Sequence, residues 1–147
     1  MGRAICGRAP WSLNLAGVTF HPGIAAADAA AGRWAVDYRL QRMRLIADVE
    51  AGMADRSEVC DVHPELLRVA RNVAQPTGED CPICDKTELR TICYVFGPRL
   101  GGGGKCVTSL EDRQRLARRS GDFSCYDVEV CAGCGWNHLL RRYPLTS

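Results

Sequence analysis

The sequence lacks an apolar run close to the roughly 20 residues that a membrane-spanning helix needs. A convincing secretory signal is also missing. Arg3 and Arg8 precede an apolar patch at residues 13–20, as in a signal peptide, but polar residues and a glycine interrupt that patch. We therefore expect residues 1–32 to be a disordered tail or an over-long gene start, with Val18 as a candidate true start.

Signatures of catalysis are missing as well. The glycine run at residues 101–104 is not a phosphate-binding loop, because Lys105 is followed by Cys106 and not by Ser or Thr. No Ser/His/Asp constellation or catalytic pair of carboxylates is evident. We expect that the protein is not an enzyme.

Cysteine, in contrast, is abundant. Nine cysteines are an odd number, and without a signal peptide they do not suggest a disulfide framework. They favour a reducing compartment in which thiols are free or bound to metal, so we expect a cytoplasmic protein.

Two Cys-x-x-Cys pairs dominate the chain, namely Cys81 with Cys84 and Cys131 with Cys134. Two residues between cysteines allow a tight turn with both sulfurs facing one point, and two such turns supply the four thiolates of a structural zinc site. The alternative is thioredoxin-like redox chemistry, which uses one pair at the start of a helix in a βαβ unit. It leaves the second pair unexplained, so we expect one structural Zn²⁺.

This metal changes the charge of the molecule. The formal charge is +2 with neutral cysteines. Four thiolates add four negative charges and Zn²⁺ adds two positive ones, which brings the total to about zero. A nearly neutral chain cannot hold nucleic acid by bulk charge, so such binding would need a local basic patch.

Residues 33–74 are expected to form a helical segment. Apolar side chains recur at helical steps between residues 33 and 51, Asp55 begins a capping box for a short helix to Asp61, and His63 caps a third helix that starts at Pro64. Three such helices are compatible with a helix-turn-helix. The second and third lack a face of base-reading side chains, so a helical cap on the remaining fold is favoured.

Residues 75–147 are expected to form a zinc-ribbon domain. A linker at residues 75–78 leads into the first cysteine pair, and strands are predicted at residues 89–96, 123–130 (half-buried) and 136–143, with a helical insertion at residues 108–120. The fold class is thus α+β: about three N-terminal helices packed with a three-stranded antiparallel zinc ribbon that carries a helical insertion. The metal is expected to supply about 10 kcal/mol of its folding free energy.

Two groups of residues are candidates for partner binding. The helical insertion carries the densest basic cluster, and further candidates lie in the last strand: Arg113, Arg115, Arg118, Arg119, Trp136, Asn137, His138, Arg141 and Arg142. The alternative for the helix is a solvated face. The alternative for His138 is a strand residue that shares a face with Trp136 and Leu140.

Five cysteines lie outside the pairs, and four of them fall in the part of the chain after residue 32. Cys60, Cys93 and Cys125 fall in predicted helix and strands, where buried packing is the usual role of a free thiol. Cys93 and Cys125 could face each other across neighbouring strands. Cys106, in the glycine loop, is the better candidate for a reactive thiol.

Several motifs over residues 33–145 resemble a family of short actinobacterial proteins catalogued as a domain of unknown function. They are Val36-Asp37-Tyr38, Glu58-Val59-Cys60-Asp61, Leu66-Leu67-Arg68, Cys81-Pro82-Ile83-Cys84, Tyr94-Val95-Phe96-Gly97 and the stretch from Val128 to Leu139. The resemblance implies a cytosolic zinc-ribbon-like protein, and family members that begin shortly before the first motif support the interpretation of residues 1–30 as an extension. It implies no activity.

Two hypotheses about function follow. The first is a non-catalytic zinc-ribbon module that binds a macromolecular machine: RNA polymerase, the ribosome or nucleic acid. The second is a redox or metal sensor in which oxidation of thiolates releases zinc. We favour the first; neither the partner nor the oligomeric state follows from the sequence.

Overall fold

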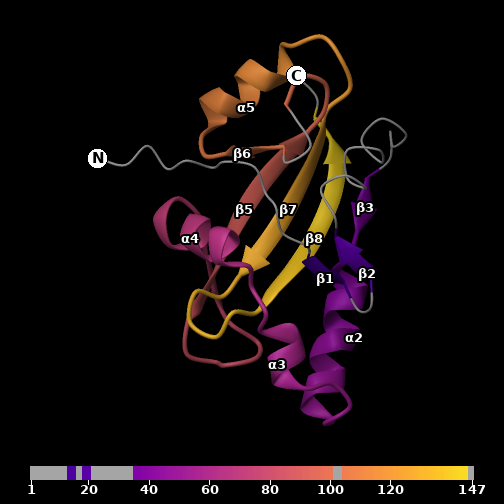
Figure 1. Ribbon diagram of the computed structural model, residues 1–147, viewed down its shortest axis with the longest axis vertical. Coiled ribbons are helices and arrows are strands. Elements are labelled where there is room, and N and C mark those ends of the chain that lie inside the picture. Colours follow the sequence, from indigo (N-terminus) through magenta and orange to yellow (C-terminus); the bar gives the residue numbers. More distant parts are fainter. Residues whose placement is uncertain (1–12, 16–17, 21–34, 101–103, 146–147) are drawn as a thin grey trace.

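A computed structural model describes residues 13–15, 18–20, 35–100 and 104–145 of the chain. Its main element is a six-stranded antiparallel sheet in the order β3-β8-β7-β5-β4, with β6 also paired to β5 (Figure 1). The strands are β3 (Val36–Asp37), β4 (Gln75–Asp80), β5 (Glu88–Phe96), β6 (Lys105–Val107), β7 (Ser124–Val130) and β8 (Asn137–Pro144).

The long strands β5, β7 and β8 correspond to the three strands predicted for the ribbon. The prediction missed β3, β4 and β6, which extend both edges of that sheet. Gln75, in the predicted linker, pairs with Thr91 near the middle of β5, and Val107 pairs with Cys93 on the same edge. β4 and β6 therefore share the outer edge of β5.

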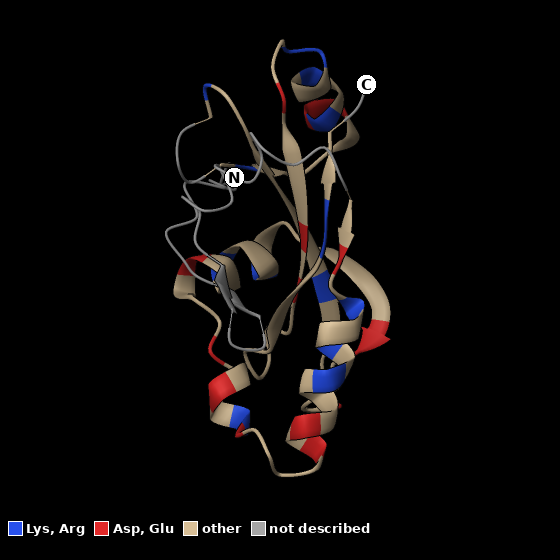
Figure 2. Ribbon diagram, turned by 90° about the vertical axis from the view of Figure 1, so that its right-hand side faces the viewer, with Lys and Arg blue, Asp and Glu red and all other residues tan. Residues whose placement is uncertain are grey.

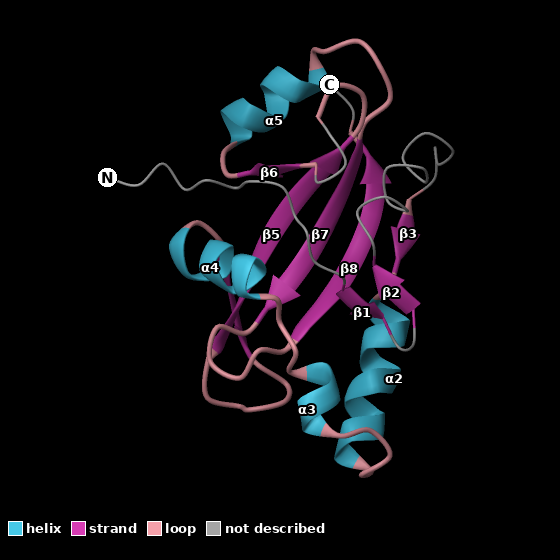
Figure 3. Cartoon of the chain, viewed as in Figure 1, coloured by secondary structure: helices cyan, strands magenta, loops and turns pink. Residues whose placement is uncertain are grey.

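Helices cover both faces of the sheet (Figure 3). On one face, α4 (Pro64–Asn72) buries Leu66, Val69 and Ala70 at helical spacing against alternate residues of β5 and β7. On the other face lie α2 (Arg39–Glu50), whose Arg42 reaches Glu129 of β7, and α5 (Leu110–Ala117), whose Leu116 packs on β5 and β7. Consequently β7 is buried on both faces, and the prediction of a half-buried strand was wrong.

Helix starts largely follow the predicted caps. Asp55 makes the predicted capping box for α3 (Arg56–Val59), and His63 accepts a hydrogen bond from the Glu65 N–H ahead of α4. Two boundaries differ from the predicted ranges. α2 starts at Arg39 because residues 36–37 join the sheet as β3, and α5 is capped by Ser109, one residue after the predicted start of the helical insertion.

Most of residues 1–32 lie outside the described residues, so the expectation of disorder or an over-long start is not addressed there. Two short strands within it, β1 (Leu13–Leu15) and β2 (Val18–Phe20), pair antiparallel. The two residues between them are the usual separation in a β-hairpin. Residues 101–103 of the predicted glycine loop also lie outside the described part.

Candidate metal centre

Two tight turns at one end of the sheet have the same backbone geometry. In the turn between β4 and β5, the Cys81 carbonyl accepts a bond from the Asp85 N–H at 2.9 Å; between β7 and β8, the Cys131 carbonyl accepts one from the Gly135 N–H at 3.0 Å. Asp85 (φ 56°) and Gly135 (φ 91°) both follow the second cysteine in the left-handed region. Glycine and, to a lesser degree, aspartate tolerate that conformation, which lets each chain reverse directly after its cysteines.

The turns bring the four predicted cysteines together. Their Sγ atoms all lie within 4.8 Å of one another, with 3.6 Å between Cys81 and Cys134 and 3.7 Å between Cys84 and Cys131. A tetrahedral ion with metal–sulfur bonds of about 2.3 Å requires sulfur–sulfur distances of about 3.8 Å. The cluster therefore has the spacing and the donor set that fit one four-coordinate metal ion.

Backbone N–H groups surround these sulfurs. The N–H groups of Ile83, Cys134 and Trp136 lie 3.4 Å from the sulfurs of Cys81, Cys131 and Cys134 respectively. Burial opposes ionisation of Cys84, but N–H groups of Lys86 and Thr87 help to lower its pKa to about 6. Burial raises the pKa of Cys81 to about 11 and also raises the pKa of Cys134. Neighbouring thiols resist joint ionisation, so a bound cation is what allows four thiolates to coexist.

Residues far apart in the sequence form an apolar wall around the cluster. Cys81, Cys131 and Trp136 are completely buried. Val59 of α3, Leu89 of β5 and three residues of α2 complete the wall: Leu45, Ile46 and Val49. The N-terminal helices thus share one core with the cysteine turns and shield them from water.

α3 and the segment after it also contact both turns. Arg56 donates to the Ile83 carbonyl of the first turn at 3.1 Å, and Val62 donates to the Gly135 carbonyl of the second, also at 3.1 Å. Between them, the Cys60 sulfur lies 3.6 Å from that of Cys134. The sequence prediction treated Cys60 as a packing residue and missed this proximity, since its only sequence signal was its place in a motif of the resembled family.

Comparison with known proteins agrees with the resemblance. Residues 30–147 match the family of unknown function DUF5318. The chain belongs to this family. It is 42% identical over 110 residues to the uncharacterized proteins Rv0049 of Mycobacterium tuberculosis H37Rv and Mb0050 of Mycobacterium bovis, which covers 75% of this chain and 80% of each relative. No solved structure matches it. In the described part of this DUF5318 chain, no helix is long and apolar enough to cross a membrane.

The predicted contact patch of Trp136, Asn137 and His138 is inside the DUF5318 fold. Trp136 and His138 are fully buried and stacked, with ring centroids 5.8 Å apart, and Asn137 is only 4% exposed. The patch was predicted from polar side chains in an end strand, but α2 packs over this part of β8. These residues are therefore not available as a contact surface, and the alternative of a buried strand face applies to His138.

A buried acid fixes that helix on the sheet. Glu129, the penultimate residue of β7, accepts hydrogen bonds from the Arg42 guanidinium and, at 2.9 Å, from the Trp136 indole N–H. The Glu129 side chain is 5% exposed and that of Arg42 is 19% exposed. No local sequence pattern singles out Glu129, because its partners lie 87 and 7 residues away.

The predicted arginines lie away from the metal centre, at the other end of the sheet. Arg115, Arg118 and Arg119 of the α5 region are exposed, whereas Arg113 is partly buried and donates to the Tyr143 hydroxyl at 2.9 Å. On β8, Arg141 is exposed and pairs with Asp127, and Arg142 is partly buried. Acidic residues accompany the basic ones in both helices: they follow the arginines in α2 and precede them in α5 (Figure 2).

Within the described part of the chain, the remaining cysteines do not extend the metal cluster. Cys93 and Cys125 are diagonal neighbours on β5 and β7, and their contact raises the pKa of Cys93 and lowers that of Cys125. Cys106 is buried in β6 and disulfide-bonded, so the prediction that it offers a reactive thiol was wrong.

Proposed function

We propose that this protein is a non-catalytic zinc-ribbon protein that serves as a small adaptor for a macromolecular machine of transcription or translation, or for nucleic acid. The observation that carries the zinc assignment is the convergence of four thiols at tetrahedral spacing. Four thiolates complete the coordination of Zn²⁺ and leave no position for an activated water, which supports a structural and not a hydrolytic role.

Metal analysis of the purified protein tests the zinc assignment. We expect one zinc per chain, and we expect a strong chelator to unfold the protein, because structural zinc supplies folding free energy. Cys131→Ser should lose both metal and fold, whereas Cys125→Ser, a buried cysteine outside the cluster, should keep one zinc. A metal-free preparation that keeps its fold in chelator would contradict the assignment.

The arginines in and directly after α5 support the adaptor role, because three of them are exposed within one short segment: Arg115, Arg118 and Arg119. We expect tagged protein from its native host to retain a polymerase, ribosomal or nucleic-acid species, and nuclease treatment to separate nucleic-acid from protein partners. Replacing Arg115, Arg118 and Arg119 by Gln should reduce retention without changing the zinc content. Retention of none of these species would argue against the adaptor role.

The Cys60–Cys134 distance favours a second candidate, a thiol redox sensor. Peroxide would take two electrons from these two thiol groups, which form a disulfide and release two protons, and the peroxide would leave as two water molecules. Cys134 would then no longer be a ligand, so zinc would be released. This candidate explains a fifth thiol 3.6 Å from a ligand sulfur.

Zinc release measured with a chromogenic chelator separates the two candidates. A sensor should release zinc at low peroxide, form the Cys60–Cys134 disulfide by peptide mass spectrometry, and regain zinc after reduction. Cys60→Ser should resist release, and Cys93→Ser should behave like the wild type. Equal release from the wild type and Cys60→Ser would exclude the sensor.

A further inference from the structure

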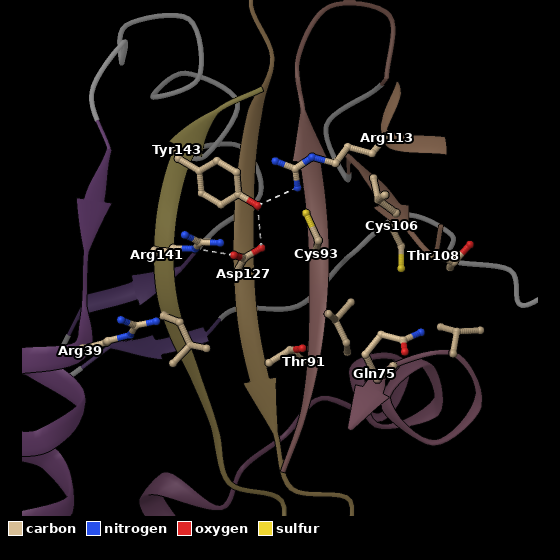
Figure 4. A pocket seen from close by; sticks show the side chains of 15 residues that line it. Arg39, Gln75, Thr91, Cys93, Cys106, Thr108, Arg113, Asp127, Arg141 and Tyr143 are labelled. Carbon is tan, nitrogen blue, oxygen red and sulfur yellow. Dashed lines mark hydrogen bonds and ion pairs between the residues drawn. The ribbon is translucent and has the colours of Figure 1, made fainter. Parts of the chain in front are cut away.

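A cavity of about 450 Å³ opens on the sheet face between α5 and the start of α2 (Figure 4). Its floor consists of side chains from the central strands, including Thr91, Cys93 and Asp127. Its volume lies within the range of small-molecule sites in proteins, about 300–1,000 Å³. It is separate from the cysteine turns, which lie at the other end of the same sheet (Figure 1).

The charged side chains of the cavity are mostly cationic. Arg39, Arg113 and Arg141 line it, and Asp127 is the one acidic residue among the described lining residues. Asp37, outside the cavity, approaches Arg39 to only 4.0 Å, and both side chains are well exposed, so that pairing is weak. The cavity therefore carries an excess of positive charge, because Asp127 offsets only one of the three arginines.

Both carboxylate oxygens of Asp127 accept a hydrogen bond within the protein. One carboxylate oxygen accepts from the Arg141 Nε–H at 2.7 Å, and the other accepts from the Tyr143 hydroxyl at 3.2 Å. The same hydroxyl accepts from Arg113 at 2.9 Å. Among the described residues, Arg113 and Arg141 thus use one side-chain N–H each within the protein, and the remaining guanidinium N–H groups are available to a ligand.

Tyr143 also holds the two guanidinium groups in place. The guanidinium carbons of Arg113 and Arg141 lie 5.2 Å and 4.5 Å from the centre of its ring. Cation–π contacts at such distances orient an arginine without neutralising it. Two positioned guanidinium groups are a typical arrangement for a phosphate, since their N–H groups match its oxygens.

We propose that this cavity binds a small phosphate monoester of the size of a sugar phosphate. A phosphate monoester carries a charge of about −1.5 to −2 at pH 7, which matches the excess charge of the cavity. Thr91 and Gln75 line the side away from Tyr143 and provide neutral hydrogen-bonding groups for the organic part. This site goes beyond the adaptor function and does not depend on it.

Calorimetric titration of the zinc-loaded full chain with ribose 5-phosphate tests the proposal, with ribose as the uncharged control. We expect ribose 5-phosphate to bind with a dissociation constant of about 1 mM or below and ribose not to bind. Arg113→Gln should weaken binding about tenfold or more, because a charge-assisted hydrogen bond is lost. The matched control is Arg115→Gln, which removes an exposed arginine of the same helix that does not line the cavity and should bind as the wild type does.

A second variant keeps the proposal testable if Arg113→Gln does not fold. Arg39→Gln changes an exposed side chain at the cavity rim and should weaken binding a few-fold while leaving the unfolding transition unchanged. Zinc content should be the same in every variant. Absence of ribose 5-phosphate binding, equal binding of ribose, or equal affinity in Arg113→Gln and Arg115→Gln would overturn the proposal.

Discussion

Removal of the Glu129 carboxylate tests whether α2 is held on the sheet by a buried ion pair. Glu129→Ala leaves the Arg42 guanidinium, 19% exposed, and the Trp136 indole N–H without their acceptor. Breaking a buried pair by removing one partner costs about 3–5 kcal/mol. A domain of this size has a total stability of about 5–15 kcal/mol, so the variant should lose a large part of it.

Glu129→Gln separates the loss of charge from the loss of the acceptor. The amide oxygen can still accept from Arg42 and Trp136, so we expect a smaller cost, about 1–3 kcal/mol. Glu79→Ala, at an exposed position of β4, is the matched control and should change stability by less than about 0.5 kcal/mol.

Urea denaturation followed by tryptophan fluorescence measures these differences. Zinc must be present at one fixed concentration, because a ligand that binds only the folded state shifts apparent stability. We expect the free energy of unfolding to be highest for the wild type and Glu79→Ala, lower for Glu129→Gln and lowest for Glu129→Ala. A Glu129→Ala variant as stable as Glu79→Ala would refute the reasoning, since the pair would then contribute nothing to the position of α2.

Two further predictions concern the surroundings of the cysteine turns. Gly135 and Gly78 both have positive φ (91° and 80°), but a Cβ at Gly135 would lie 2.8 Å from the Cys60 carbonyl oxygen, whereas Gly78 has open space. In urea denaturation Gly78→Ala should therefore lower the free energy of unfolding by about 1–2 kcal/mol through backbone strain. Gly135→Ala should lower it clearly more and should also retain zinc less tightly. Equal losses of stability in the two variants would contradict the close approach of Cys60. Burial lowers the pKa of His138, although the Leu139 carbonyl and Glu129 act to raise it. As the pH falls, the His138 imidazole is therefore protonated in the unfolded chain at a higher pH than in the folded protein. Stability should consequently fall as pH drops below about 6.5, by at most about 1.4 kcal/mol per pH unit from this group. His138→Phe should show a shallower fall in its urea midpoint between pH 7.5 and 5.5, and an unchanged slope would show that His138 does not contribute.

Local sequence signals predicted the parts of the fold that local chemistry determines. The caps at Asp55 and His63, the turn-forming spacing of the cysteine pairs and the apolar strand around Tyr94 all act within a few residues. The convergence of the two turns was also predictable, because four thiolates that bind one ion must meet.

The missed elements depend on contacts that are distant in sequence. All six residues of β4 are exposed, and Pro76 and Gly78 interrupt it, so it has no strand pattern. It forms a strand because the first cysteine turn returns the chain along β5. In the same way, nothing local to Trp136 or His138 indicates that α2 covers them, and nothing local to Cys60 indicates its distance from Cys134.

The shared core of the helices and the cysteine turns means that residues 75–147 should not fold as an independent unit. A fragment starting at residue 75 would lack α2 and α3, and the indole of Trp136 and the side chain of Leu89 would face water beside an unshielded cluster of thiolates. Such a fragment should aggregate or lose its ion faster than the intact chain does. Substitutions at the far end of the sheet, around α5, should therefore disturb the cysteine turns less than substitutions at the end where α2 and α3 pack against those turns.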